Sequence, residues 1–316
     1  MINYFQGEKM DYANLTKDEF LRLTAPEEPA DFVSFWKETY ALATAQTPTW
    51  HIEREIWSLK EDTRTYLIRA KTWDNCEIAM WISRPEKSKG GLLVGQGYGQ
   101  PATAGYYPSM TVCFPCVRGL GQSQCRNIPW EVSKHVIHGI SSKETYILRG
   151  VISDLWTAAT VMTEMFPDTA ENLCYSGGSM GGGMGALMLP WDKRFRAAYL
   201  LVPTFGGNHV RLLVPSNGSG EAVRLYVQEH PEAMNVLAYF DAAISAKYIS
   251  IPTIVCPALE DTVVAPAGQF CVANSIPEKY KMLYILDKGH AAGTERDQVL
   301  MEEVEEKKKK LFYNEI

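Results

Sequence analysis

The chain has 316 residues, of which 46% are hydrophobic and 22% are charged, as is typical of a globular protein. Its formal net charge of -6, without a basic stripe interleaved with aromatic residues, argues against a nucleic-acid partner. No apolar run reaches the roughly 20 residues of a membrane span, and the start of the chain lacks the pattern of a signal peptide. We therefore expect a cytoplasmic protein, unless an export signal lies outside this sequence.

Residues 1–50 are predicted to form an arm and a docking helix. The polar, proline-bearing start contains one short helix around Thr16–Thr24. Asp31 is then expected to cap a second helix, whose aromatic residues recur at helical spacing. These aromatic residues are Phe32, Phe35, Trp36 and Tyr40. Such a stripe is typical of a helix face that docks against a core.

Three runs rich in β-branched and aromatic residues then predict antiparallel strands at His51–Leu59, Thr65–Thr72 and Glu77–Arg84. From Leu92 onward, buried strand patterns alternate with amphipathic helices, which predicts a mostly parallel sheet covered on both faces. The expected strands are Leu92–Val94, Met110–Val117, Asn172–Ser176, Phe195–Val202, Thr253–Leu259 and Lys281–Leu286, and the main helices are Arg149–Phe166, Gly182–Leu189 and Ala265–Ser275. Residues 203–245 are predicted to be a lid-like insertion. Without a repeat or linker, residues 1–316 are expected to form one domain.

The seven cysteines are scattered through the chain, a pattern that suits a reducing compartment. Cys113 and Cys116 form a C-x-x-C pair, which is typical of a redox pair or of half a zinc site. No second pair has a suitable spacing, and Pro115 lies within an apparent strand. We therefore expect no metal ion here and leave the role of the pair open.

Ser179 lies at the centre of a G-x-S-x-G motif, between the apolar run that ends near Ser176 and a helix that begins near Met180. A serine on a strained strand-to-helix turn needs small neighbours on both sides, so that its hydroxyl stands clear of the sheet. The following helix would aim its first amides at an anion held near the serine. The alternative is a glycine-rich loop that only packs a helix tightly on a strand, and the motif alone leaves both open.

Downstream residues favour the catalytic interpretation. A nucleophilic serine needs an imidazole to take its proton and an acid to orient the imidazole. Asp261 and His290 follow the last two predicted strands, in the chain order serine, acid, histidine. Glu260 is a competitor for the acid, but neighbouring residues on an extended segment point in opposite directions. We therefore predict a triad of Ser179, Asp261 and His290.

The tetrahedral intermediate of acyl transfer requires two donors for its oxyanion. The backbone amide of Met180, directly after the serine, is one candidate. The amide of Tyr98, in the glycine-rich loop Gly95–Gln100 that follows a buried strand, is the other. A plain turn is the alternative for this loop. The predicted chemistry is attack by Ser179 and hydrolysis of an acyl-enzyme, with no cofactor.

These residues together resemble the acetyl xylan esterase and cephalosporin C deacetylase group, carbohydrate esterase family seven. The matching pieces are Asp31-Phe32, Phe35-Trp36, Gly97-Tyr98-Gly99, Arg118-Gly119-x-Gly121-x-Ser123, Arg149-Gly150, Asp154, the Ser179 motif with Gly182-Gly183, Tyr239-Phe240-Asp241, Asp261-Thr262 and Gly289-His290. The resemblance implies an α/β-hydrolase fold and removal of acetyl groups from small O-acetylated sugars, often by a homohexamer.

The sequence departs from the family's usual residues at four positions. Met180 stands where glutamine is usual, Gln96 replaces histidine, Ala291 replaces glutamate, and Cys116 occupies a typically acidic position. The backbone amide at position 180 is present with methionine as it is with glutamine, so this oxyanion donor is kept. The shape of the acyl pocket and the preferred substrate are left undetermined by these departures.

We therefore predict a serine esterase that deacetylates small carbohydrate esters. A different α/β-hydrolase activity, such as that of a peptidase or a longer-acyl esterase, is one alternative. A catalytically silent relative that acts as a binding protein is another, although the intact Ser179, Asp261 and His290 argue against it.

Overall fold

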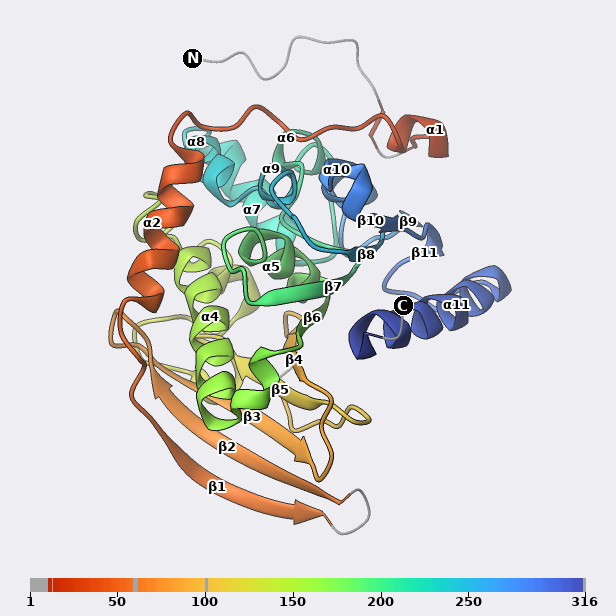
Figure 1. The fold of residues 1–316 in the computed structure, drawn as a ribbon. Helices are drawn as coiled ribbons and strands as arrows, with labels where there is room; N and C mark the ends of the chain where they lie inside the picture. The colour runs from red at the N-terminus through yellow and green to blue at the C-terminus, as the bar shows by residue number, and fades with distance from the viewer. Residues whose placement is uncertain (1–10, 13, 59–61, 100–101, 315–316) are drawn as a thin grey trace.

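The computed structural model describes residues 11–12, 14–58, 62–99 and 102–314. Within them, one large sheet has nine strands in the order β1-β2-β3-β5-β4-β6-β7-β8-β10 (Figure 1). The strands are β1 (Trp50–Ser58), β2 (Thr63–Lys71), β3 (Glu77–Pro85), β4 (Gly91–Gly95), β5 (Thr111–Cys116), β6 (Leu173–Gly178), β7 (Phe195–Leu201), β8 (Thr253–Cys256) and β10 (Lys281–Leu283). The first three strands and β5 pair antiparallel, whereas the pairs from β5 through β4 to β10 are parallel. The predicted fold class is confirmed.

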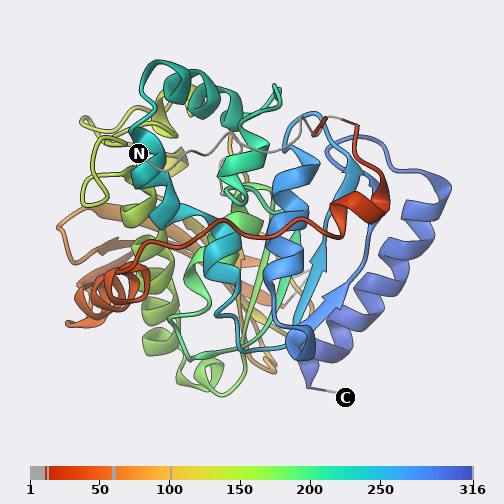
Figure 2. The ribbon, with the colours of Figure 1, turned by 90° about the horizontal axis from the view of Figure 1, so that it is seen from above.

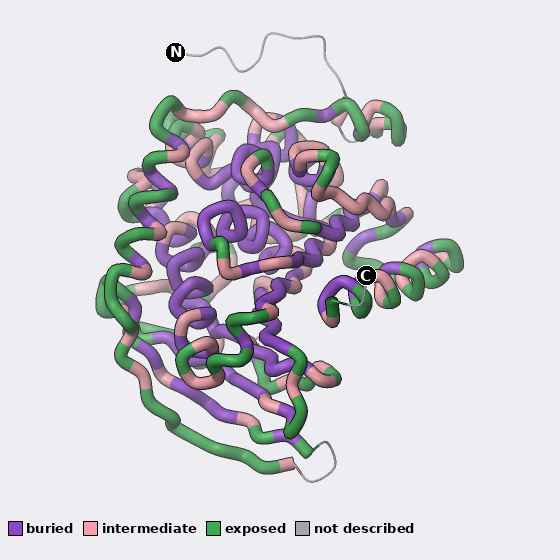
Figure 3. Tube along the Cα trace, viewed as in Figure 1, coloured by how far each residue is buried: buried purple, intermediate pink, exposed green. Residues whose placement is uncertain are grey.

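Helices cover the parallel part of the sheet on both faces (Figure 1). On one face, α4 (Ile147–Met165) packs against β4 and β5, and α5 (Met180–Met188) packs against β6. Beside α5 lies α9 (Ala242–Ala246), and α10 (Pro266–Ser275) packs against α9. The helix α10 begins at a proline, whose missing N–H would have no helical partner at that position. The long α11 (Glu295–Tyr313) covers the other face. Burial is greatest in the layer between α5 and the sheet, whereas β1 is exposed along almost its whole length (Figure 3).

The predicted aromatic stripe is the docking face of α2 (Phe32–Thr44). Trp36 is fully buried against Trp156 of α4, and its indole N–H donates to the Tyr239 carbonyl over 2.8 Å. Asp31 precedes this helix, but its side chain makes no capping hydrogen bond. Its carboxylate instead accepts from Lys143 (2.6 Å) and from the Tyr239 hydroxyl. Asp31 therefore holds the predicted N-cap position, but its side chain does not cap the helix.

The first helix, α1 (Lys17–Phe20), is shorter than predicted, although Thr16 and Glu19 form a capping box at its start. Residues 21–31 then run across α9 and α10 toward α2 (Figure 2). The Asn274 side-chain amide fixes this crossing by donating to the carbonyls of Phe20 and Leu23. The predicted strand end at Leu59, the loop end at Gln100 and most of the first 14 residues lie outside the described residues.

Each of the last two predicted strands is divided in two. After β8 and β10 the chain leaves the large sheet and forms a second, two-stranded parallel sheet from β9 (Ala258–Glu260) and β11 (Leu286–Lys288). Pro257 separates β8 from β9, and its lack of an N–H prevents a continuous ladder there. The small sheet therefore carries the segments that lead to Asp261 and His290.

The predicted insertion contains α6 (Asn208–Arg211), α7 (Ser219–Glu229) and α8 (Ala233–Leu237), and a further short helix, α3 (Val132–His135), lies close to α7. The described residues also contain four 3-10 turns, at Gly121–Ser123, Pro167–Ala170, Ala238–Phe240 and Glu278–Tyr280. Among the described residues, no helix has the length and apolar character to cross a membrane.

Candidate active site

Ser179 occupies a sharp turn between β6 and α5, with the unfavourable backbone angles φ 55° and ψ -118°. A Cβ atom on Gly181 would lie 2.3 Å from the Gly95 carbonyl oxygen, and one on Gly177 would lie 2.5 Å from that of Gly181. Only glycine therefore permits the close approach of the helix to β4 and β6. The Ser179 amide donates to the Leu201 carbonyl over 2.9 Å, which ties the turn to β7. This is the strained geometry that the motif predicts.

Asp261 and His290 form a hydrogen-bonded pair. The imidazole Nδ1 of His290 lies 2.8 Å from Oδ2 of Asp261, whose side chain is fully buried. Because the carboxylate is an acceptor, the pair places a hydrogen on Nδ1 and leaves Nε2 as the basic nitrogen. The neighbouring Glu260 side chain is 75% exposed, as the alternation along an extended segment predicts.

The Asp261 carboxylate receives three further hydrogen bonds. Oδ1 accepts from the amides of Val263 (2.8 Å) and Val264 (3.1 Å), and Oδ2 accepts from the Gln269 side-chain amide (2.9 Å). Gln269 is itself buried in α10 and also bonds the backbone at Ala258 and Val264. Gln269 is not among the predicted site residues, because a glutamine within a helix matches no catalytic motif. Its position eight residues after Asp261, on a helix that begins near the acid, is the one signal in the sequence that could have identified it.

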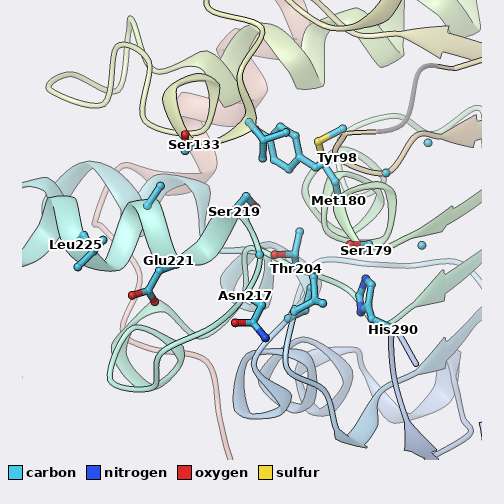
Figure 4. A pocket seen from close by; sticks show the side chains of 18 residues that line it. Tyr98, Ser133, Ser179, Met180, Thr204, Asn217, Ser219, Glu221, Leu225 and His290 are labelled. Carbon is cyan, nitrogen blue, oxygen red and sulfur yellow. The ribbon is translucent and has the colours of Figure 1, made fainter. Parts of the chain in front are cut away.

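Ser179 and His290 line a cleft of about 890 Å³, between α3 on one side and α7 on the other. In Figure 4 both lie at one end of the cleft, and Glu221 and Leu225 of α7 lie at the other. The wall formed by α7 and the loop before it carries the polar residues Asn217 and Ser219 toward the serine. Within the described residues, no lysine or arginine lines the cleft. The insertion therefore forms one wall of the site, and its action as a lid stays a prediction.

Tyr98 and Met180, the two predicted oxyanion donors, line this same cleft. Met180 is the first residue of α5, where no preceding helical turn can accept its amide hydrogen. The loop that carries Tyr98 is tied to the end of β5, because Oε1 of Gln96 accepts from the Val117 amide over 3.0 Å. The Gln96 side chain thus holds the Tyr98 loop against the end of β5.

The phenol of Tyr98 is anchored by a second, buried histidine. Its hydroxyl lies 3.0 Å from Nδ1 of His135, whose Nε2 lies 3.0 Å from the Arg118 carbonyl. Since a carbonyl can only accept, Nε2 carries the hydrogen and Nδ1 accepts from Tyr98. Burial raises the pKa of Tyr98 well above its ordinary value and lowers the pKa of His135, so both are neutral near pH 7. Arg118 in turn pairs with the buried Asp154 at 2.7 Å and with Asp74 at 2.6 Å.

Cys113 and Cys116 lie in β5 with buried, free thiols, and burial raises the pKa of both. This environment is typical of inert structural cysteines rather than of reactive ones. The part of the chain that the structure describes contains no group of three or more potential metal ligands.

The sequence profile of the acetyl xylan esterase (AXE1) family matches residues 10–303. The structure is similar to the acetyl xylan esterase from Paenibacillus sp. R4 (TM-score 0.76, 19% identity, 92% of this chain and 99% of that one). It is equally similar to acetyl xylan esterase 1 from Thermoanaerobacterium sp. JW/SL YS485 (TM-score 0.76, 18% identity, 92% and 98%). These likenesses show that the chain has the α/β-hydrolase fold.

A curated relative, the acetyl esterase Axe7A of Xylanibacter ruminicola, is 24% identical over 142 residues. The matched region makes up 45% of this chain and 32% of that protein, so it spans about a third of the relative's length.

Proposed function

The chain belongs to the acetyl xylan esterase family, and from this premise we propose that it is a serine esterase that hydrolyses acetyl esters of small carbohydrates. The observation that carries the proposal is the hydrogen bond between His290 and the buried Asp261, at the cleft that the strained Ser179 also lines. An acid, a base and a serine on a tight turn are the parts that acyl transfer requires.

In the proposed reaction, Oγ of Ser179 attacks the ester carbonyl carbon while Nε2 of His290 takes the hydroxyl proton. The intermediate collapses as the C–O bond to the sugar breaks, and the imidazolium returns its proton to the sugar oxygen. Water, deprotonated by His290, then attacks the acetyl-enzyme and releases acetate and Ser179. Asp261 keeps the imidazole in the required tautomer and stabilises its positive charge.

The backbone amides of Met180 and Tyr98 are the proposed donors to the oxyanion. Each such donor contributes about 3–4 kcal/mol to the stabilisation of the transition state. Support comes from their shared cleft, from the position of Met180 at the start of α5, and from the anchoring of the Tyr98 ring on His135.

A neutral sugar fits the cleft better than an anionic substrate. Asn217, Ser219 and Ser133 offer amide and hydroxyl groups for sugar hydroxyls. Glu221 is the one acidic residue among the lining residues described, and its carboxylate is paired with Arg224 at 2.6 Å. Without a lining cation, a substrate carboxylate would lose its hydration and gain no partner.

We also propose a cytoplasmic homo-oligomer, as the resemblance to the family implies. Exposed apolar residues on β1, namely Ile52, Ile56 and Trp57, support association through this edge strand. Size-exclusion chromatography with light scattering tests the association, and a monomer at micromolar concentration would contradict it.

The function is tested by hydrolysis of p-nitrophenyl acetate, butyrate and octanoate, with Ser179→Ala as the control. We expect rapid turnover of acetate that falls with chain length and is lost in the variant. Preference for octanoate, or hydrolysis of amides, would favour a longer-acyl esterase or a peptidase. Turnover no faster than that of Ser179→Ala would favour a binding protein.

A further inference from the structure

The backbone around Tyr98 is weakly restrained by its own neighbours. Gly97 and Gly99 flank this residue, and Gly99 has a φ of 75°, a conformation that residues with a side chain rarely adopt. The Gln96 side chain fixes the start of the loop, but the peptide units between the two glycines can still rotate. An oxyanion donor is effective only when it is oriented before the reaction. The side chain of Tyr98 is therefore the part of the residue that can supply this orientation.

The ring of Tyr98 is held at its edges and at its hydroxyl group. The imidazole of His135 meets it at 78°, with 5.6 Å between ring centroids, and Phe205 meets it at 84° and 6.4 Å. The hydroxyl lies 3.0 Å from Nδ1 of His135. Only two rotatable bonds join a tyrosine ring to the backbone, so fixing the ring and its hydroxyl restricts the position of the Cα atom. The orientation of the Tyr98 amide thus depends on the position of His135.

His135 is itself a fixed support. It is fully buried at the end of α3, and its backbone amide donates to the Glu131 carbonyl over 2.8 Å. Its Nε2 lies 3.0 Å from the Arg118 carbonyl, which uses the one hydrogen of the neutral ring and leaves Nδ1 as the acceptor for Tyr98. The space for the ring depends on Gly119, where a Cβ atom would lie 2.9 Å from the imidazole Cδ2. His135 is not one of the described residues that line the cleft, so any effect on the reaction passes through Tyr98.

We propose that His135 is a positioning residue for acyl transfer: by accepting the hydroxyl hydrogen of Tyr98, it orients the Tyr98 backbone amide toward the oxyanion that forms on the ester carbon. The inference rests on the proposed function and adds to it a residue outside the triad and the cleft. The alternative is that His135 only satisfies buried polar groups. In that case its replacement would lower stability without a specific effect on kcat.

The test replaces the imidazole by two different amides. In His135→Asn, Oδ1 takes the position of Nδ1 and can still accept from Tyr98. In His135→Gln, the amide nitrogen reaches the position of Nε2 and keeps only the hydrogen bond to the Arg118 carbonyl. We expect His135→Gln to lower kcat for p-nitrophenyl acetate by about 10- to 100-fold with KM little changed, whereas His135→Asn should stay within about 3-fold of wild type.

Tyr98→Phe provides a second, independent variant, because it keeps the ring and removes only the hydroxyl group. Its kcat should fall as far as that of His135→Gln, and the double variant Tyr98→Phe/His135→Gln should lose little more than either single variant. Urea unfolding of each protein separates an effect on kcat from a loss of stability. If His135→Gln does not fold, the kcat of Tyr98→Phe decides the question.

Equal kcat values for the Asn and Gln variants, or a wild-type kcat for Tyr98→Phe, would overturn the positioning role and leave the esterase proposal intact. Failure of wild type to hydrolyse p-nitrophenyl acetate would contradict the proposed function instead. The positioning role is then tested with a fluorophosphonate, from which Oγ of Ser179 displaces fluoride while the phosphoryl oxygen takes the place of the oxyanion. Slower labelling of Tyr98→Phe and His135→Gln than of His135→Asn supports the role, and equal rates or the absence of labelling reject it.

Discussion

A Cβ atom placed on Gly289 would lie 2.5 Å from Oδ2 of Asp261, the oxygen that faces Nδ1 of His290. The glycine before the histidine thus leaves the space that the carboxylate occupies. Its backbone amide donates to the Glu260 carbonyl over 2.8 Å, which holds the two loops together. The distance between acid and imidazole is therefore set by the absence of a side chain at Gly289.

We expect Gly289→Ala to displace Asp261 or His290 and to lower kcat by about 100-fold, because displacements near 1 Å have such effects in active sites. The measurement is steady-state hydrolysis of p-nitrophenyl acetate, with circular dichroism to confirm folding. If Gly289→Ala acts by displacing the Asp261 carboxylate, the double variant Gly289→Ala/Asp261→Asn should have a kcat only slightly lower than that of Asp261→Asn alone. If the fold-decrease in kcat of the double variant equals the product of the two single decreases, this explanation is contradicted.

Asp261→Asn should lower kcat by about 10⁴-fold with little change in KM, because an amide can hold the imidazole in the wrong tautomer. Glu260→Gln is a matched control: it removes the adjacent carboxylate, which is 75% exposed, and should retain wild-type activity. Comparable losses in the two variants would show that the acid has been assigned to the wrong residue.

Gln269→Leu should lower both stability and activity. The substitution leaves the Ala258 amide and the Val264 carbonyl without their buried partner and removes one donor from Asp261. We expect a decrease of about 1–3 kcal/mol in the free energy of unfolding, measured with urea. Gln228→Leu, at an exposed position of α7, should change it by less than about 0.5 kcal/mol. Equal stabilities of the two variants would contradict the role of Gln269.

The buried His135 should make the fold sensitive to acid. Burial lowers the pKa of His135 in the folded state. Below about pH 6.5, the imidazole is therefore protonated more readily in the unfolded chain than in the folded chain. The free energy of unfolding should therefore fall as pH decreases through this range and be unaffected by His135 above it. His135→Gln should show a shallower decrease between pH 7 and 5 than wild type. His230→Gln, at an exposed position, should follow wild type, and identical slopes for all three proteins would refute the prediction.

The sequence predicted the fold class and the turn at Ser179, because glycine spacing and strand patterns have direct steric causes. It also predicted which of Glu260 and Asp261 turns inward. The strand divisions were missed at Pro257 and before Leu286, since a continuous apolar run does not show that its two halves pair in different sheets. Gln269 and His135 were missed as participants because their partners, Asp261 and Tyr98, are brought to them only by tertiary packing. The single domain, the triad roles, the oligomer and the location stay predictions.

The two-stranded sheet of β9 and β11 has a mechanical consequence. Asp261 and His290 follow strands that pair with each other, whereas Ser179 follows a strand of the large sheet. The acid and the base are therefore positioned by the same two-stranded sheet, and the nucleophile is positioned by the large one. A displacement of the small sheet relative to the large one would lengthen the path from serine to imidazole before it disturbed the carboxylate–imidazole hydrogen bond.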